Sequence, residues 1–582
     1  MECDRRHPSP PPAPKVHIAK PEQDRNLSPP IRKPILLARI SKKPRRPRGR
    51  LRSQCCRLPM PFVQVLASEL QNACLPGYGA VACLNMAAVN NAAPDQYARH
   101  RPQQGLFYRI IETYWPIFVR EQGRVGKTLP IFIRDEFEKF LKCGIPEHGF
   151  IRTYCYQCQY SGIVAFSCKK RGFCPSCTAR RMNDEAAHLV DHVLPPEVPM
   201  RQWVLSFPYK LRFLMAHNSK LTNRILSVYI KAIGSSLKKR AKKSGIKGGK
   251  PGSVTFIQRF GSALNLNVHF HTLFADGVFY KKDDGYYFFR LPPPSQEELY
   301  FLAAKIKTKV LKVIDELGLN DQDQMGFDED ALSPIAAMSI SHKAAFGERG
   351  GGNLKRYGIK KIEVDPEGND PFSVNVDGFS LNARVGIWGK EKEKLEKLIR
   401  YMARGPVATE RLTECFPNTL LYRMKTPWKD GTTHVSFSYL DFIARLVALI
   451  PPPKMNMVRY HGVFAPNFKD RGLVVPEPKA DPAESAAATV ACDTPCTAQV
   501  RRERMRWSEM LKRTFEIDVT VCPDCNGRLE QIAVIKDKAV AAAILKSLDE
   551  VSIFRPLEIV RERGPPGDGG DFPDEFDQRA SW

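Results

Sequence analysis

The alternation of apolar and polar positions along the chain predicts a mixed α+β protein. Apolar residues recur at helical spacing from Leu106 onward and again over 131–141. A basic helical region ends near Lys243, and the next stretch, 253–280, alternates apolar and polar side chains as strands do. A charged amphipathic helix follows at 391–404. We therefore expect an antiparallel sheet with helices covering it.

The stretch 264–271 shows the clearest alternation in the chain. Its apolar members are Leu264, Leu266, Val268 and Phe270, and its polar members are Asn265, Asn267, His269 and His271. Because successive side chains of a strand point to opposite faces, one face should pack on a core while the other presents two imidazoles beside two amides. Two imidazoles at this spacing can share one divalent metal, which would polarise a phosphodiester. The alternative is a purely structural pair of histidines.

Tyr401 lies at the edge of the apolar face of the helix expected over 391–404. That face consists of Leu395, Leu398, Ile399 and Met402. Arg400 and Arg404 place positive charge beside the tyrosine. A free tyrosine has a pKa near 10, so nearby cations or a metal are needed for its phenolate to act as a nucleophile. Taken alone, a tyrosine in this position is more often a packing residue.

Potential zinc ligands cluster between residues 143 and 177. They are Cys143, His148, Cys155, Cys158, Cys168, Cys174 and Cys177. A Cys-x-x-Cys turn directs two thiolates at one tetrahedral Zn²⁺, so we expect structural zinc here. Seven ligands fit either one site with spare residues or two sites that lack one ligand. Another pair, Cys522 and Cys525, lies far downstream, where Cys492 and Cys496 are the nearest residues that could complete a site.

The charge of the chain favours a polyanionic partner. It has 89 Lys and Arg against 62 Asp and Glu, a formal net charge of +27, which points to nucleic acid or an anionic membrane surface. No run of about 20 apolar residues is present, and the N-terminus lacks the apolar core of a secretory signal. We therefore expect a cytoplasmic protein that does not contact membrane. Basic residues suited to phosphate contact surround the cysteines: Lys169, Lys170, Arg171, Arg180 and Arg181.

Together these segments resemble the rolling-circle insertion-sequence transposases of the ninety-one type, including their common-region relatives. The resemblance covers about 103–550, and the N-terminal arm lies outside it. The matching stretches are 140–144, 166–177, 180–182, 201–208, 258–261, 269–271, 400–404 and 460–466. Several members of the family carry a second tyrosine four residues after the first. Gly405 stands there in this chain, which therefore resembles the single-tyrosine branch.

The resemblance implies an HUH-type nuclease that acts on single-stranded DNA at the element's ends and in the target. In it, His269 and His271 would bind Mg²⁺ or Mn²⁺, while Tyr401 would attack the scissile phosphate, keep the 5′ end and release a 3′-OH. Arg400 and Arg404 would contact DNA, and the zinc module would bind DNA at the bacterial nucleoid. Re-use of the single tyrosine, or a second subunit of a homo-oligomer, would replace the missing tyrosine.

A third ligand for the catalytic metal is left open among Gln258, Asn267 and Asp276. Two other functions also remain possible on these residues. A non-catalytic zinc-finger protein that binds nucleic acid would explain the charge and the cysteines. A metal-dependent phosphodiesterase that uses water would need no tyrosine, whereas a related relaxase or replication initiator would use the same tyrosine chemistry.

These expectations divide the chain into six segments. They are a disordered basic, Pro-rich arm (1–102), a helical zinc-binding and DNA-binding domain (103–197), an HUH-type catalytic domain (198–466), a linker (467–502), a small C-terminal module with a Cys-x-x-Cys pair (503–550) and a disordered tail (551–582).

Overall fold

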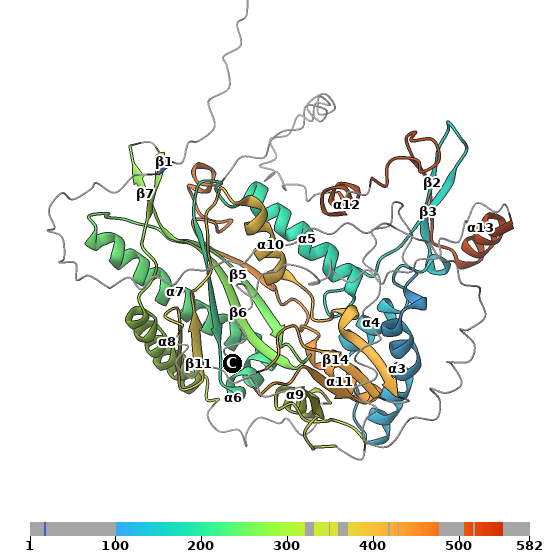
Figure 1. Ribbon diagram of the computed structural model, residues 1–582, viewed down its shortest axis with the longest axis horizontal. Coiled ribbons are helices and arrows are strands. Elements are labelled where there is room, and N and C mark those ends of the chain that lie inside the picture. The colour runs from blue at the N-terminus through green and yellow to red at the C-terminus, as the bar shows by residue number, and fades with distance from the viewer. Residues whose placement is uncertain are drawn as a thin grey trace, which may run out of the picture. The chain divides into compact units, whose positions relative to one another are not determined.

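The structure is a computed structural model (Figure 1). It describes residues 17–18, 101–283, 285–319, 331–347, 350–358, 370–416, 419–428, 430–475, 506–515 and 518–550. The expected tail lies wholly outside these residues, and the expected arm and linker lie largely outside them.

An antiparallel sheet forms the centre of the described chain, as the alternation predicted. Its strand order is β10-β11-β4-β6-β5-β16, and β12 pairs with β4 at one end. Every neighbouring pair in this sheet is antiparallel. The strands are β4 (Met200–Ser206), β5 (Gly252–Phe260), β6 (Leu266–Ala275), β10 (Ser373–Val376), β11 (Phe379–Asn382), β12 (Gly386–Ile387) and β16 (Val458–Gly462).

The two faces of β6 belong to different cores. Val268 and Phe270 pack in the larger core, beneath helices from several parts of the chain. These helices include α6 (Tyr209–His217), α7 (Ser219–Lys243), α8 (Gln296–Glu316), α9 (Leu332–Ile340) and α11 (Tyr439–Leu449). The alternate residue Leu273 packs in a second, smaller core on the opposite face. His269 and His271 share the side of Leu273, because they differ from it by an even number of residues.

Two helices cover that second face. They are α5 (Pro175–His192) and α10 (Lys392–Ala403), which lie side by side (Figure 1) and pack closely. Leu395, Leu398 and Ile399 of α10 are buried with Leu189 and Val190 of α5. The apolar face predicted for the helix at 391–404 is therefore the face that closes this core.

Several boundaries agree with the sequence pattern, and one expected element is divided. The helical region before Lys243 consists of two helices, α6 and α7, which are separated at Asn218. The Asn218 side chain accepts a hydrogen bond from the backbone N–H of Leu221 at 2.9 Å and so caps α7. An N-cap of this kind starts a new helix, which explains the break.

The cysteine-rich region follows helices α3 (Leu106–Arg124) and α4 (Ile131–Phe140) and contains a ribbon that the pattern did not predict. The ribbon consists of β2 (Phe150–Tyr154) and β3 (Ser161–Ala165). A strand of the C-terminal module, β17 (Glu530–Ile535), adds to it beside β2. The module also contains α12 (Trp507–Phe515) and α13 (Lys538–Glu550). Segments about 370 residues apart in the chain, 150–165 and 530–535, therefore share one small sheet.

The remaining strands form two smaller sheets at the periphery. They are β1 (His17–Ile18), β7 (Gly277–Lys282) and β8 (Gly285–Arg290) in one sheet, and β9 (Arg356–Tyr357), β13 (Leu412–Phe416), β14 (Thr419–Arg423) and β15 (His434–Phe437) in the other. Short 3₁₀ turns cover Pro102–Gln104, Pro146–His148, Thr409–Arg411 and Arg471–Leu473. No helix in the described part of the chain is both long and apolar enough to cross a membrane.

Candidate active site and cysteine clusters

The two histidines of β6 lie together beneath α10. Their ring centroids are 4.8 Å apart, and each residue is 1% exposed. Their burial keeps them from solvent. They also lie outside the larger apolar core, because Val268 and Phe270, which alternate with them along β6, point into that core. The polar face predicted for 264–271 is therefore present, but it is buried.

Each imidazole is held through its Nδ1 atom. His269 Nδ1 donates to the backbone oxygen of Asn267 at 2.9 Å, so its lone pair lies on Nε2. His271 Nδ1 lies 2.9 Å from Nε2 of Gln202, a fully buried residue of β4. The Gln202 Oε1 atom is also buried and has no hydrogen-bond partner among the described residues. Rotating this amide by half a turn would let Oε1 accept from His271 Nδ1, which places the His271 lone pair on Nε2 as well.

Tyr401 of α10 lies against His271. Its ring centroid is 5.9 Å from that of His271 at an interplanar angle of 88°, and the residue is 1% exposed. Two cations lie over the phenol ring: Arg404 Cζ is 4.8 Å and Lys425 Nζ is 5.3 Å from its centroid. Sequence reasoning missed Lys425, because this residue follows strand β14 and belongs to no motif of the tyrosine helix.

The three candidates for a third metal ligand lie in different surroundings. Asp276 accepts hydrogen bonds from Arg201 at 3.0 and 2.8 Å in a buried ion pair, which already uses both carboxylate oxygens. Gln258 is the cross-strand partner of His269, and its Nε2 donates to the backbone oxygens of Tyr401 and Met402, at 3.3 and 2.8 Å. It therefore holds the end of α10.

Asn267 differs from these two candidates. It shares the polar face of β6 with both histidines, and its Oδ1 atom is buried with no hydrogen-bond partner in the described part of the chain. A buried amide oxygen of this kind is available to a cation, whereas the oxygens of Asp276 are engaged.

The first cysteine cluster joins Cys143, Cys168, Cys174 and Cys177. Their Sγ atoms lie 3.4 Å apart for Cys168 and Cys177, and 3.7 Å apart both for Cys143 and Cys177 and for Cys174 and Cys143. Four sulfurs at 2.3 Å from a tetrahedral zinc ion would be about 3.8 Å apart, so the spacing fits zinc. Contacts with the neighbouring thiols, above all Cys143, lower the pKa of Cys177 and raise those of Cys168 and Cys174.

A second cluster joins Cys155, Cys158, Cys522 and Cys525. The Sγ atoms of Cys155 and Cys525 are 3.5 Å apart, and those of Cys158 and Cys522 are 3.4 Å apart. A hydrogen bond from the backbone N–H of Cys158 is the main cause that lowers the pKa of Cys155 to about 7.

Cys522 and Cys525, which are distant in sequence, thus supply the ligands that the second group of four needs. Neither group of four includes His148, which the sequence had offered as a ligand. Cys492 and Cys496, the nearest partners suggested by the sequence, lie outside the described residues.

Two family models match the chain. Residues 110–207 match the family described as “Transposase zinc-binding domain”, and residues 252–471 match the family described as “Putative transposase”. The chain belongs to the insertion-sequence transposases of the ninety-one type. The first match contains the first cysteine cluster, the second contains the histidine pair and Tyr401, and Cys522 and Cys525 lie beyond both. Comparison with curated proteins and with solved structures gave no match.

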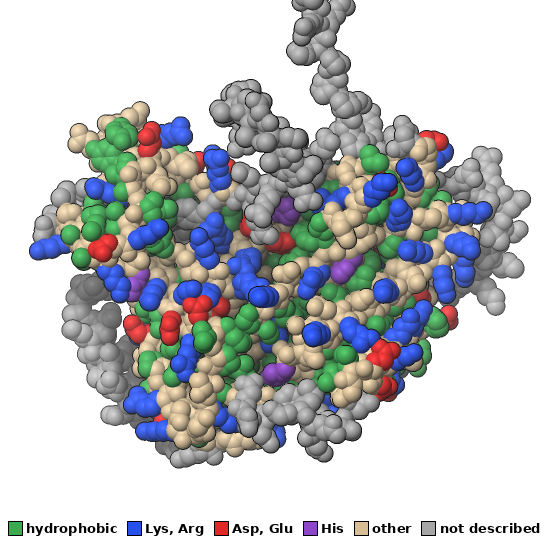
Figure 2. Space-filling model, turned by 180° about the vertical axis from the view of Figure 1, so that it is seen from behind, with side chains coloured by type: hydrophobic (Ala, Val, Ile, Leu, Met, Phe, Trp, Pro, Cys, Tyr) green, Lys and Arg blue, Asp and Glu red, His purple; other side chains and the backbone are tan. Residues whose placement is uncertain are grey.

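A transposase binds DNA, and positive charge is spread over its surface. Figure 2 shows Lys and Arg side chains over much of one face, with fewer acidic ones. Near the first cysteine cluster, Lys169 and Arg180 are exposed. By contrast, Lys170 is paired with Asp135, and Arg171 donates to the backbone oxygen of Met455.

The remaining basic candidates are half-buried. Arg181 donates to the backbone oxygen of Lys169 at 3.2 Å, and Arg400 lies in the last turn of α10. Of the residues proposed from sequence to contact phosphate, Lys169 and Arg180 are therefore the most accessible.

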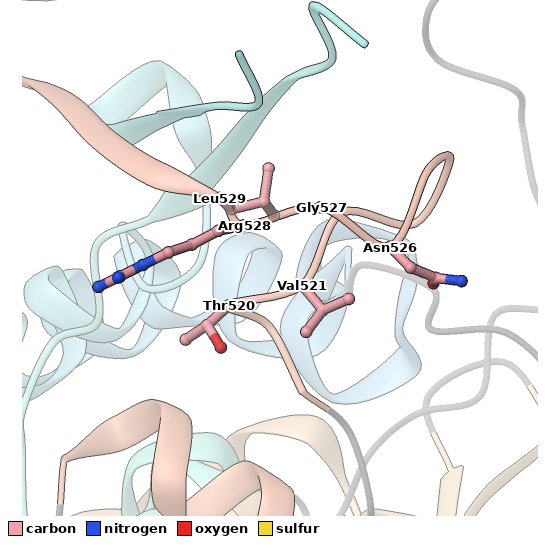
Figure 3. Close-up of a pocket in the computed structure, with 6 residues that line it drawn as sticks. All are labelled: Thr520, Val521, Asn526, Gly527, Arg528 and Leu529. Carbon is pink, nitrogen blue, oxygen red and sulfur yellow. The ribbon is translucent and has the colours of Figure 1, made fainter. Parts of the chain in front are cut away.

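A shallow pocket in this transposase lies away from the histidine pair. It is lined by Thr520, Val521, Asn526, Gly527, Arg528 and Leu529 (Figure 3). None of the candidate catalytic residues lines it, so it is a feature of the C-terminal cysteine turn and not of the candidate active site.

Proposed function

We propose that this transposase nicks and rejoins single-stranded DNA through a covalent bond between Tyr401 and the cut strand. The observation that carries the proposal is the contact between Tyr401 and His271, one of the two paired histidines. The two segments are distant in sequence, yet the ring of Tyr401 lies 5.9 Å from that of His271. A purely DNA-binding zinc protein has no need to bury a tyrosine, two imidazoles and two cations in one place.

The donor set of the site suits Mg²⁺ or Mn²⁺. His269 offers Nε2, because its Nδ1 is bonded to a backbone oxygen, and His271 offers Nε2 once the Gln202 amide accepts from its Nδ1. Asn267 Oδ1 adds an oxygen on the same face of β6. Nitrogen and oxygen ligands together fit Mn²⁺, and a bound ion would supply positive charge to the phosphate during the reaction.

The bond changes assign a role to each remaining group. The Tyr401 oxygen would lose its proton and form a bond to phosphorus, while the bond from phosphorus to the 3′ oxygen breaks and that oxygen takes up a proton. Arg404 and Lys425, which lie over the ring, would stabilise the phenolate and the charge on the phosphate. Rejoining is the reverse reaction with a 3′-OH from another strand, so no external energy source is needed.

Burial of the site requires a conformational step. His269, His271 and Tyr401 are each 1% exposed, so DNA reaches them only when part of the surrounding protein moves. A single strand would need a smaller opening than a duplex, which agrees with the proposed single-stranded substrate.

The absence of a second tyrosine restricts how two strands can be exchanged. Gly405 stands four residues after Tyr401, just beyond the end of α10, and a Cβ atom there would lie 2.5 Å from Thr178 Oγ1 of α5. A tyrosine at this position would displace α5. We therefore include in the proposal that Tyr401 acts in successive steps or that a second subunit of a homo-oligomer supplies the other nucleophile.

The decisive experiment uses purified protein, Mn²⁺ and labelled single-stranded DNA that spans the element's own terminus. The wild type should form an adduct that survives a denaturing gel, and Tyr401→Phe should form none. Tyr439→Phe is the matched control: Tyr439 is a buried tyrosine that stacks on Tyr114 and donates to Glu414, so the adduct should persist in this variant.

Other outcomes would redirect the proposal. Cleavage without an adduct in Tyr401→Phe would indicate water as the nucleophile and support the phosphodiesterase alternative. Binding without cleavage by the wild type would leave a DNA-binding protein and contradict the proposed chemistry.

A further inference from the structure

The cysteine turns of the second cluster have the same backbone structure, although one lies near the N-terminus and the other near the C-terminus. In the first turn, the Cys155 N–H donates to Tyr160 O, and the Gln159 N–H donates to Cys155 O, both at 2.9 Å. In the second turn, the Cys522 N–H donates to Gly527 O at 2.7 Å, and the Asn526 N–H donates to Cys522 O at 3.0 Å. Each bond joins the same two positions relative to the first cysteine of its pair.

The residue after each Cys-x-x-Cys pair has a left-handed backbone. Gln159 has φ of 64° and Asn526 has φ of 56°. This conformation is uncommon for residues other than glycine, so its occurrence at the same position in both turns shows a shared geometry. Gly527 then allows close approach: a Cβ atom there would lie 2.2 Å from Gln157 Oε1 of the other turn. Figure 3 shows the second turn, with Thr520 and Val521 on one side and Gly527 to Leu529 on the other.

Strand pairing brings the two turns to the same end of the ribbon. Cys155 directly follows β2, and β17 begins shortly after Cys525. Because β17 and β2 are antiparallel, with Glu530 opposite Tyr154, the end of one strand lies beside the start of the other. The four sulfurs meet there, all within 4.8 Å of one another.

Strand β17 itself buries little apolar surface. Ile532 and Val534 of β17 are among the exposed large apolar residues of the described chain. Arg513 of α12 makes ion pairs with Asp191 of α5 and Glu396 of α10. Partly exposed ion pairs contribute little to stability, because water screens them. The apolar burial of β17 and these ion pairs therefore stabilise its position weakly, and a metal would contribute much more.

We propose that a second structural zinc ion is bound by Cys155, Cys158, Cys522 and Cys525. This ion would hold the C-terminal module against the ribbon of β2 and β3. The site would be a zinc ribbon made of two similar turns from opposite ends of the chain. Half of it lies outside both matched families, which end at residues 207 and 471. The proposal does not depend on the tyrosine chemistry.

The test is the zinc content of the full-length protein, measured by native mass spectrometry and by elemental analysis. The wild type should carry two zinc ions per chain, and the double variant Cys522→Ser, Cys525→Ser should carry one. Cys415→Ser is the matched control, since Cys415 belongs to neither group of four and its loss should change nothing. One ion in the wild type, or two in the double variant, would overturn the proposal.

A second measurement needs no variant. Cys158 and Cys525 are exposed, so N-ethylmaleimide can reach both sulfurs. We expect both to resist labelling in the native protein and to become reactive after chelation, as followed by peptide mass spectrometry. Rapid labelling before chelation contradicts the zinc site. Disulfides between Cys155 and Cys525 and between Cys158 and Cys522 in the freshly purified protein would contradict it as well.

Discussion

At the scale of single residues, the proposed chemistry depends on which nitrogen of each imidazole carries the proton. A ring that binds a metal through Nε2 must keep its proton on Nδ1, and a hydrogen-bond acceptor at Nδ1 fixes that state. The Asn267 backbone oxygen does this for His269 without any side chain. His271 relies instead on Gln202, whose amide can either accept or donate. The identity of residue 202 should therefore influence the affinity of the site for metal.

Substitution of Gln202 tests this dependence. Gln202→Leu removes the partner of His271 Nδ1, so the Mn²⁺ concentration that gives half of the maximal adduct should rise about 10-fold or more. Gln202→Glu retains an acceptor and should stay closer to the wild type. The thermal midpoint of each variant serves as the control for folding. An unchanged Mn²⁺ requirement in a well-folded Gln202→Leu protein would show that the amide does not orient the ring.

The sequence predicted part of this site. The alternation in 264–271 placed both histidines on one polar face, and family resemblance picked out Tyr401. The sequence could not identify Gln202 or Lys425, because each reaches the site from another strand or turn and belongs to no repeating pattern. Nor could it decide among the candidates for a third ligand, since the arginine that engages Asp276 lies in a different strand.

At the scale of elements, the contact between α5 and α10 connects the zinc module to the tyrosine helix. Cys174 and Cys177 lie at the start of α5, so the first cluster fixes the end of this helix. One helical position further along, Thr178 packs against Gly405, which follows α10. A change in this contact should therefore shift the tyrosine helix relative to the sheet.

Gly405→Ala measures how tight that contact is. The added methyl group would lie 2.5 Å from Thr178 Oγ1 and 2.7 Å from Thr178 Cβ, so we expect a loss of about 1–3 kcal/mol of stability, together with slower adduct formation. Gly123→Ala in α3 is the matched control, because a Cβ there meets nothing within 4 Å. That change should be neutral or stabilise by up to about 1 kcal/mol. Equal thermal midpoints for the two variants would show that α5 can shift away from residue 405 at little cost in stability.

Elements with an apolar face were predictable, and elements that depend on metal ligands were not. The helix expected over 391–404 is α10, Lys392–Ala403, because its apolar residues repeat at helical spacing. The ribbon β2–β3 has two five-residue strands beside thiols and no strong alternation. Its pairing with β17 joins segments far apart in the chain, which no local pattern can indicate.

At the scale of the whole molecule, the net charge of +27 predicts salt-sensitive DNA binding but not which residues produce it. The fold separates residues that sequence reasoning had grouped. Lys169 and Arg180 face solvent, whereas Lys170 forms an ion pair with Asp135, and its hydrogen bond is the main cause that lowers the pKa of that carboxyl. Charge that is already neutralised within the protein releases few counterions from DNA.

This separation leads to a prediction about the dependence of DNA affinity on salt. Each contact with a phosphate of single-stranded DNA contributes about 0.7 to the slope of log K against log salt. Lys169→Gln and Arg180→Gln should therefore each reduce the slope by about 0.7, and the double variant by about 1.4, when binding is titrated over a range of salt concentrations. Lys170→Gln removes the same charge from an adjacent position, yet it should leave the slope nearly unchanged, because that charge is held by Asp135. Equal reductions for Lys169→Gln and Lys170→Gln would mean that DNA displaces Asp135 and that all basic residues near the first cysteine cluster act as one surface.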